Sequence, residues 1–76
     1  MWLNISYKNK NRQLINLDKT LSIQVTHSDA EVALYIGYPA VLIGSADYIE
    51  KQYGRILVAL KNNDPICNIY EEGVTQ

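Results

Sequence analysis

The spacing of apolar residues changes once along this chain of 76 residues, and this change constrains the fold more than any other feature. In the first half, apolar and polar residues alternate in short runs, most regularly at residues 21–26, where Leu, Ile and Val alternate with Ser, Gln and Thr. Successive side chains of a β-strand point to opposite faces, so a period of two predicts half-buried strands. Short turns separate the runs, and strands joined by short turns run antiparallel.

In the second half the apolar residues take the spacing of a helix. Five of them fall at positions i, i+4, i+7, i+8 and i+11, which is one face of an α-helix: Ile49, Tyr53, Ile56, Leu57 and Leu60. Ser45 or Asp47 can cap the start by accepting a backbone N–H, and Asp47 with Glu50 has the spacing of a capping box. The residue before Pro65 disfavours α geometry. The sequence therefore predicts one amphipathic helix that starts near Ser45 and ends before Pro65.

These elements predict an α+β domain, in which an antiparallel sheet of four to five strands carries one amphipathic helix on one face. The expected strands lie at residues 3–7, 13–17, 21–26, 32–36 and 40–43. The length allows one domain, and we place its boundary at residue 64. Residues 65–76 are expected to form a C-terminal tail that is ordered only in part, at residues 66–70, and frayed from Glu71 onward.

The charges are divided unevenly along the chain. Seven basic and eight acidic residues give a net charge of −1. Residues 1–26 carry four basic residues against one acidic residue, whereas residues 27–76 carry three against seven. The two halves can therefore neutralise each other within one fold or between two copies.

The ends and the cysteine content predict where the protein works. The first residues do not resemble a signal peptide, and no run approaches the ~20 apolar residues of a membrane-spanning helix. The one cysteine cannot form an intramolecular disulfide. We therefore expect a cytoplasmic protein without a membrane contact.

Few residues offer catalytic or metal-binding chemistry. His27 lies in a predicted turn with Asp29, where a solvated side chain is the simpler interpretation, and Cys67 between apolar neighbours is best interpreted as a small core residue. Together they do not have the spacing of a zinc site, and the four scattered glycines do not form a phosphate-binding loop. We predict no catalytic site, no cofactor and no metal.

The aromatic residues suggest an interface. The chain has six tyrosines and one tryptophan but no phenylalanine. Tyrosine combines an apolar ring with a polar end, which suits surfaces that meet another chain. Because one helix covers one sheet face, the other face is left for water or a partner. We therefore predict a non-catalytic structural or interaction domain that self-associates, most simply as a homodimer, through an interface that includes Trp2, Tyr35, Tyr38 and Tyr70.

The alternative is a weak nucleic-acid-binding module. Lys8, Lys10 and Arg12 alternate with asparagines at a predicted hairpin tip, and such cations can lie along phosphates. We rank this function second, because the net charge is negative and the basic residues are few.

Three segments also carry a resemblance. The run Leu14-Ile15-Asn16-Leu17-Asp18, the strand end Leu42-Ile43-Gly44 before the helix, and Trp2 near the start resemble a group of short prokaryotic and phage proteins. These proteins begin with an aromatic strand, have an LINLD-like corner and lead from an LLG-like strand into an amphipathic helix. The resemblance covers roughly residues 2–61, implies the same order of elements, and implies no activity and no functional residues.

Overall fold

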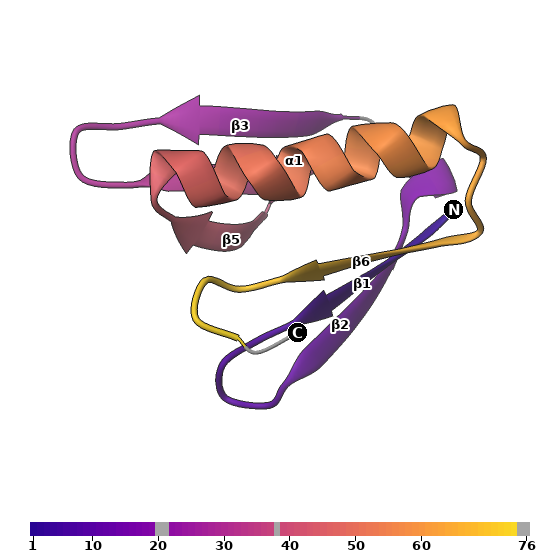
Figure 1. Cartoon of the computed structure of the whole chain (residues 1–76), viewed down its shortest axis with the longest axis horizontal. Coiled ribbons are helices and arrows are strands. Elements are labelled where there is room, and N and C mark those ends of the chain that lie inside the picture. Colours follow the sequence, from indigo (N-terminus) through magenta and orange to yellow (C-terminus); the bar gives the residue numbers. More distant parts are fainter. Residues whose placement is uncertain (20–21, 38, 75–76) are drawn as a thin grey trace.

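The computed structural model describes residues 1–19, 22–37 and 39–74, which form two three-stranded sheets and one helix (Figure 1). Sheet 1 has the strand order β2-β1-β6 and sheet 2 the order β3-β4-β5. The strands are β1 (Trp2–Ser6), β2 (Arg12–Asn16), β3 (Ile23–His27), β4 (Val32–Ile36), β5 (Ala40–Gly44) and β6 (Ile66–Tyr70). The helix is α1 (Ala46–Lys61), and a 3-10 turn, η1 (Leu17–Lys19), follows β2.

The α+β class with one helix is confirmed, and the expected antiparallel sheet of four to five strands is only roughly matched. The described residues contain six strands in two sheets. Neighbouring strands joined by turns are antiparallel, as expected, whereas β6 pairs with β1 in parallel. This parallel pair arises because α1 carries the chain back along the molecule before β6 begins.

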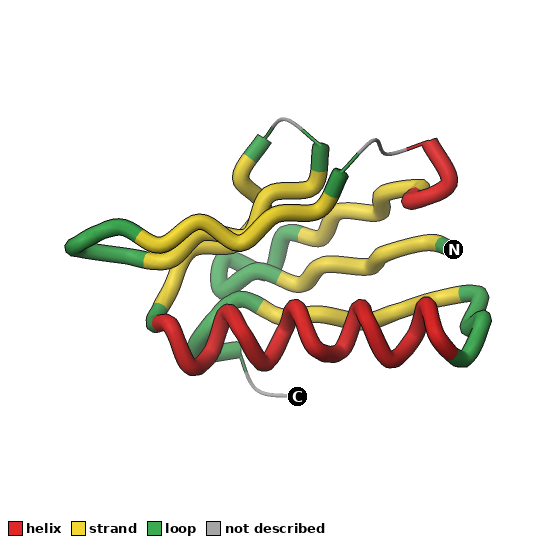
Figure 2. Tube along the Cα trace, turned by 90° about the horizontal axis from the view of Figure 1, so that it is seen from above, coloured by secondary structure: helices red, strands yellow, loops and turns green. Residues whose placement is uncertain are grey.

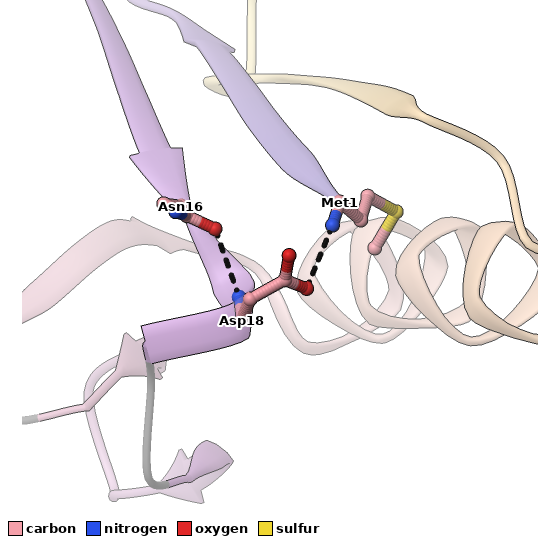
Figure 3. A network of polar contacts seen from close by, with 3 residues as sticks. All are labelled: Met1, Asn16 and Asp18. Carbon is pink, nitrogen blue, oxygen red and sulfur yellow. Dashed lines mark hydrogen bonds and ion pairs between the residues drawn. The ribbon is translucent and has the colours of Figure 1, made fainter.

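The division into two sheets occurs at the corner formed by η1 (Figure 3). The Asp18 backbone N–H donates to Asn16 Oδ1 at 3.0 Å, which is the local bond of an Asx turn. The N-terminal ammonium of Met1 donates to Asp18 Oδ1 at 2.8 Å, and the Leu17 N–H donates to the Met1 carbonyl. The corner therefore stays attached to β1 while the chain leaves sheet 1 for sheet 2.

The C-terminal segment contributes a strand at residues 66–70, the part of the tail expected to be ordered. Residues Ile66–Tyr70 form a full strand, and Ile69 is completely buried. The two residues after the strand also contact the rest of the fold. Glu71 accepts a bond from the Lys8 N–H, and Glu72 accepts two bonds from Ser45. Residues 75 and 76 lie outside the described residues.

The buried face of α1 is rotated from the predicted stripe. Its buried residues are Ile49, Gln52, Ile56 and Ala59. Leu57 and Leu60, predicted to be internal, are 47% and 45% exposed, and Tyr53 is half-buried. The apolar spacing misses this face because it contains a glutamine, whose Oε1 accepts a bond from the Tyr70 N–H.

The predicted helix cap is also only partly correct. Ser45 is the N-cap residue, but its side chain makes no capping bond and its hydroxyl instead donates to Glu72. Asp47 lies inside the first turn, where its charge suits the positive end of the helix dipole.

The core lies where both sheets meet α1. Its completely buried apolar residues come from three strands and the helix: Leu3, Ile5, Leu34, Ile49, Ile56 and Ile69. The helix runs alongside β6 and also contacts each strand of sheet 2 (Figures 1 and 2). The opposite face of sheet 1 is therefore left without a helix. Among the described residues, no helical segment combines the length and apolar character needed to cross a bilayer.

Candidate interaction surface

The outer face of sheet 1 is the side that points away from α1 and the core. It is defined by the residues that alternate with the buried Leu3, Ile5, Cys67 and Ile69: Trp2, Asn4, Ser6, Arg12, Leu14, Asn16, Ile66, Asn68 and Tyr70. Arg12, at one end of β2, is the one charged residue in this set. Three large apolar side chains on it are exposed, Trp2 by 44%, Leu14 by 59% and Ile66 by 55%.

The register places these residues next to each other. Trp2 lies directly opposite Ile66 on the neighbouring strand β6. On the other side of β1, Leu14 lies opposite Asn4, one row from Trp2. Asn4 Nδ2 donates to Asn68 Oδ1 at 3.0 Å, which holds β1 and β6 together on this face. The outer face therefore combines an apolar area with uncharged polar groups.

The free edge of β2 borders this face. The Tyr7 N–H donates to the Asn11 carbonyl and the Leu17 N–H to the Met1 carbonyl. In an antiparallel ladder alternate residues bond to the same neighbour, so the odd-numbered residues of β2 bond to β1. The N–H and carbonyl groups of Arg12 and Leu14 consequently point away from the sheet. This edge strand carries an exposed leucine at its centre.

The opposite edge of sheet 1, on β6, is covered by α1. On this edge, the Tyr70 N–H donates to Gln52 Oε1 at 3.3 Å, and the Tyr48 hydroxyl donates to the Tyr70 carbonyl at 2.8 Å. Burial raises the pKa of the Tyr48 hydroxyl, which therefore stays protonated and able to donate. A shallow groove of about 440 Å³ follows this edge beside Gly54, Arg55 and Val58.

The described members of the predicted interface do not share one face. Trp2 and Tyr70 lie on the outer face of sheet 1, and the Arg55 guanidinium lies 5.8 Å from the centre of the Tyr70 ring. Tyr35 is half-buried on the side of β4 that points away from the core, in sheet 2. Tyr38 lies outside the described residues. The structure thus brings Trp2 and Tyr70 to one face and places Tyr35 elsewhere.

The sequence prediction missed Leu14 and Ile66. Their positions in alternating runs show that each shares a face with polar neighbours. Only the pairing of β1 with both β2 and β6 brings them to one face with Trp2.

The basic hairpin tip lies against acidic residues. Lys8, Lys10 and Arg12 are all exposed around the turn, where Lys10 has a positive φ of 71°. The Lys8 N–H donates to Glu71 Oε1 at 2.8 Å. Hydrogen bonds from Ser45 lower the pKa of Glu72, and the charge of Lys8 lowers it further. The positive charge at the tip is therefore partly balanced within the chain.

His27 and Cys67 are not brought together with other reactive groups. His27 Nε2 lies 3.1 Å from Glu50 Oε1, and both side chains are more than half exposed. Cys67 is buried, its Sγ lies 3.7 Å from the Arg55 carbonyl, and burial raises the pKa of its thiol. Among the described residues, no group of three or more His, Cys, Asp or Glu side chains is placed to hold a metal ion.

Comparisons with protein-family models, curated proteins and solved structures find no match to this chain. The resemblance to short prokaryotic and phage proteins therefore stays a prediction.

Proposed function

We propose that this chain is a non-catalytic interaction domain that self-associates, most simply as a two-fold homodimer. The observation that carries the proposal is the outer face of sheet 1, where Trp2, Leu14 and Ile66 are exposed together. Protein interfaces are depleted of charge at their centre and enriched in aromatic residues. A face whose one charged residue, Arg12, lies at its margin and which exposes a tryptophan fits that composition.

The contrast with ordinary exposed strands supports this function. Strands that face water are commonly protected by lysines, prolines or bulges, which discourage pairing with other chains. In β2 the one charged residue is Arg12, at the first position, and the centre is Leu14. The register shift lies elsewhere, between Leu34 and Tyr35 of sheet 2.

The test is the mass in solution. Sedimentation velocity from low to high micromolar protein should show a species of twice the chain mass of 8.6 kDa that dissociates on dilution. The double variant Trp2→Lys, Leu14→Lys should shift this equilibrium strongly toward the monomer, because it introduces two charges into the proposed interface.

The matched control is Ile43→Lys. Ile43 is a large apolar residue of sheet 2 whose side chain is 50% exposed. Its replacement by lysine should leave the mass of the dimer in solution unchanged. A chain that remains at 8.6 kDa at every concentration would refute the proposed function.

The alternative, nucleic-acid binding at Lys8, Lys10 and Arg12, has less support. Glu71 is hydrogen-bonded to the backbone of Lys8, and Glu72 lies close enough for Lys8 to shift its pKa. These carboxylates would repel phosphates approaching the tip.

A further inference from the structure

We propose that two copies associate by antiparallel pairing of β2 with the partner's β2, which joins the two copies of sheet 1 into one six-stranded sheet. This inference rests on the proposed function and places the contact between the two copies at the β2 edge, where the outer face ends. In the proposed register, Leu14 lies opposite the partner's Leu14, so that the whole of β2 overlaps with its copy.

The backbone of β2 supplies the bonds for this pairing. Arg12 and Leu14 direct their N–H and carbonyl groups away from β1, as the ladder alternation requires. In the proposed register, each Leu14 exchanges two hydrogen bonds with the partner's Leu14. Arg12 comes opposite the partner's Asn16. Two identical strands can pair in this way because an antiparallel arrangement about a two-fold axis is self-complementary.

The charges of this segment lie at the ends of β2. Lys10 and Arg12 lie at its start, and Asp18, which is bonded to the Met1 ammonium of its own chain, lies just past its end together with Lys19. The centre of the proposed contact, at residues 13–15, is therefore uncharged, and the pairing rests on the outward backbone groups and on Leu14.

The other edge of sheet 1 does not offer the same opportunity. The helix α1 lies along β6 and already bonds to the outward groups of Tyr70 through Gln52 and Tyr48. A second strand on that edge would have to displace these contacts. Edge pairing through β2 needs no such rearrangement, and it places exposed Leu14 beside a copy of itself.

The decisive variant is Leu14→Pro, which removes the outward N–H at the centre of the edge. Proline is tolerated on edge strands where its N–H would face away from the sheet, so the variant should fold. We expect circular dichroism like that of the wild type but a monomeric mass. The matched variant Leu14→Ala keeps the N–H and should remain able to dimerise, with a weaker dissociation constant.

A further control separates edge pairing from contact between outer faces. Ile66 lies on the same face as Leu14 but on β6, the strand farthest from the proposed edge. In an edge-paired dimer, Ile66→Lys should leave the dissociation constant within about twofold, because surface substitutions away from a contact have small effects.

Amide hydrogen exchange tests the wild type directly, without a variant that has to fold. The Leu14 N–H should become protected as the concentration rises through the dissociation constant. The Asn68 N–H, on the opposite edge, should exchange at a rate independent of concentration.

The outcomes separate this inference from the proposed function. A dimer that persists in Leu14→Pro and dissociates in Ile66→Lys would overturn β2 pairing and leave self-association standing. A dimer whose Leu14 N–H exchanges equally fast at all concentrations would do the same. A wild type that is monomeric throughout would overturn both.

Discussion

Glu72 receives two hydrogen bonds from Ser45, the residue that precedes α1. The Ser45 N–H donates to Glu72 Oε1 at 3.0 Å, and the Ser45 hydroxyl donates to Glu72 Oε2 at 2.9 Å. The serine that would ordinarily cap its own helix thus binds a carboxylate from the far end of the chain. This contact connects the segment after β6 to the junction between β5 and α1.

Replacement of Glu72 by Gln should lower the stability of the fold in a pH-dependent way. The bonds from Ser45, followed by the charge of Lys8, lower the pKa of Glu72 below its ordinary value of 4.5. A group with a lowered folded-state pKa contributes its stability above the unfolded-state pKa and loses it as the pH falls through the folded-state value. The urea midpoint of the wild type should exceed that of Glu72→Gln at pH 6, and the two should converge below pH 4.5. A difference that persists unchanged at pH 3 would show that the charge of Glu72 is not responsible.

Gly44→Ala should act through the same contact. A Cβ at position 44 would lie 2.9 Å from Glu72 Oε1, so the carboxylate would have to move away from Ser45. Because a side-chain end can move, the expected loss is moderate. Substitutions that remove one shared contact are not additive. The double variant Gly44→Ala, Glu72→Gln should therefore be little less stable than Glu72→Gln alone, and full additivity of the two unfolding free energies would contradict this mechanism.

Two residues of α1 with the same predicted role should respond differently. Ile56 is completely buried, and Ile56→Ala should lower the free energy of unfolding by about 2–5 kcal/mol, which is typical of large-to-small core substitutions. Leu60 is 45% exposed, and Leu60→Asp should leave a folded, cooperative protein. Thermal unfolding followed by circular dichroism measures both. An unfolded Leu60→Asp variant would show that Leu60 contributes to the core.

This pair of residues also shows how far the sequence predicts the fold. The 3.6-residue period and the residues that begin and end a helix correctly locate α1, because both signals depend only on neighbouring residues in the sequence. It did not identify the buried face, since α1 lies against β6 through Gln52, and a buried glutamine is recognised only from its bond to Tyr70. A polar residue inside the stripe cannot be distinguished from a solvent-facing one by its spacing alone.

The same limit applies to the candidate interface. Trp2 was identified from its residue type, and its exposure in the structure agrees with an outward position. Leu14 was assigned to a strand, but whether that strand lies at an edge depends on which strands flank β1. The parallel partner β6 follows 60 residues after β1 in the chain. No local pattern encodes a pairing between such distant segments. Only the structure shows that β2 lies at an open edge of sheet 1.

Cys67 should react slowly with thiol reagents in the folded protein. It is 6% exposed, and burial raises the pKa of its thiol above the ordinary value of 9.0. The thiolate is the reactive form, so both effects reduce the labelling rate. Ellman's reagent at pH 7 should label the native protein much more slowly than the protein in denaturant. Equal rates in the two states would show that the edge of sheet 1 near α1 opens freely.

The basic hairpin tip provides the last test, which concerns the alternative function. We expect no measurable binding of single-stranded or double-stranded DNA at physiological salt, because Glu71 and Glu72 lie beside Lys8. Two of the described aromatic residues lie near the tip, and both are engaged within the chain: the Tyr7 hydroxyl donates to Gln13, and the Tyr70 ring lies 5.8 Å from the Arg55 guanidinium. Non-specific binding of single strands generally needs aromatic surfaces on which bases stack.

Fluorescence anisotropy with labelled oligonucleotides over a range of salt concentrations measures this directly. Phosphate contacts release counterions, so true binding would weaken linearly in a plot of log affinity against log salt, with a slope of about three contacts for Lys8, Lys10 and Arg12. The matched control is the variant with all three residues replaced by Ser, which should keep its stability because the side chains are exposed. Sub-micromolar, salt-dependent binding that this variant loses would favour nucleic-acid binding over self-association as the function of the domain.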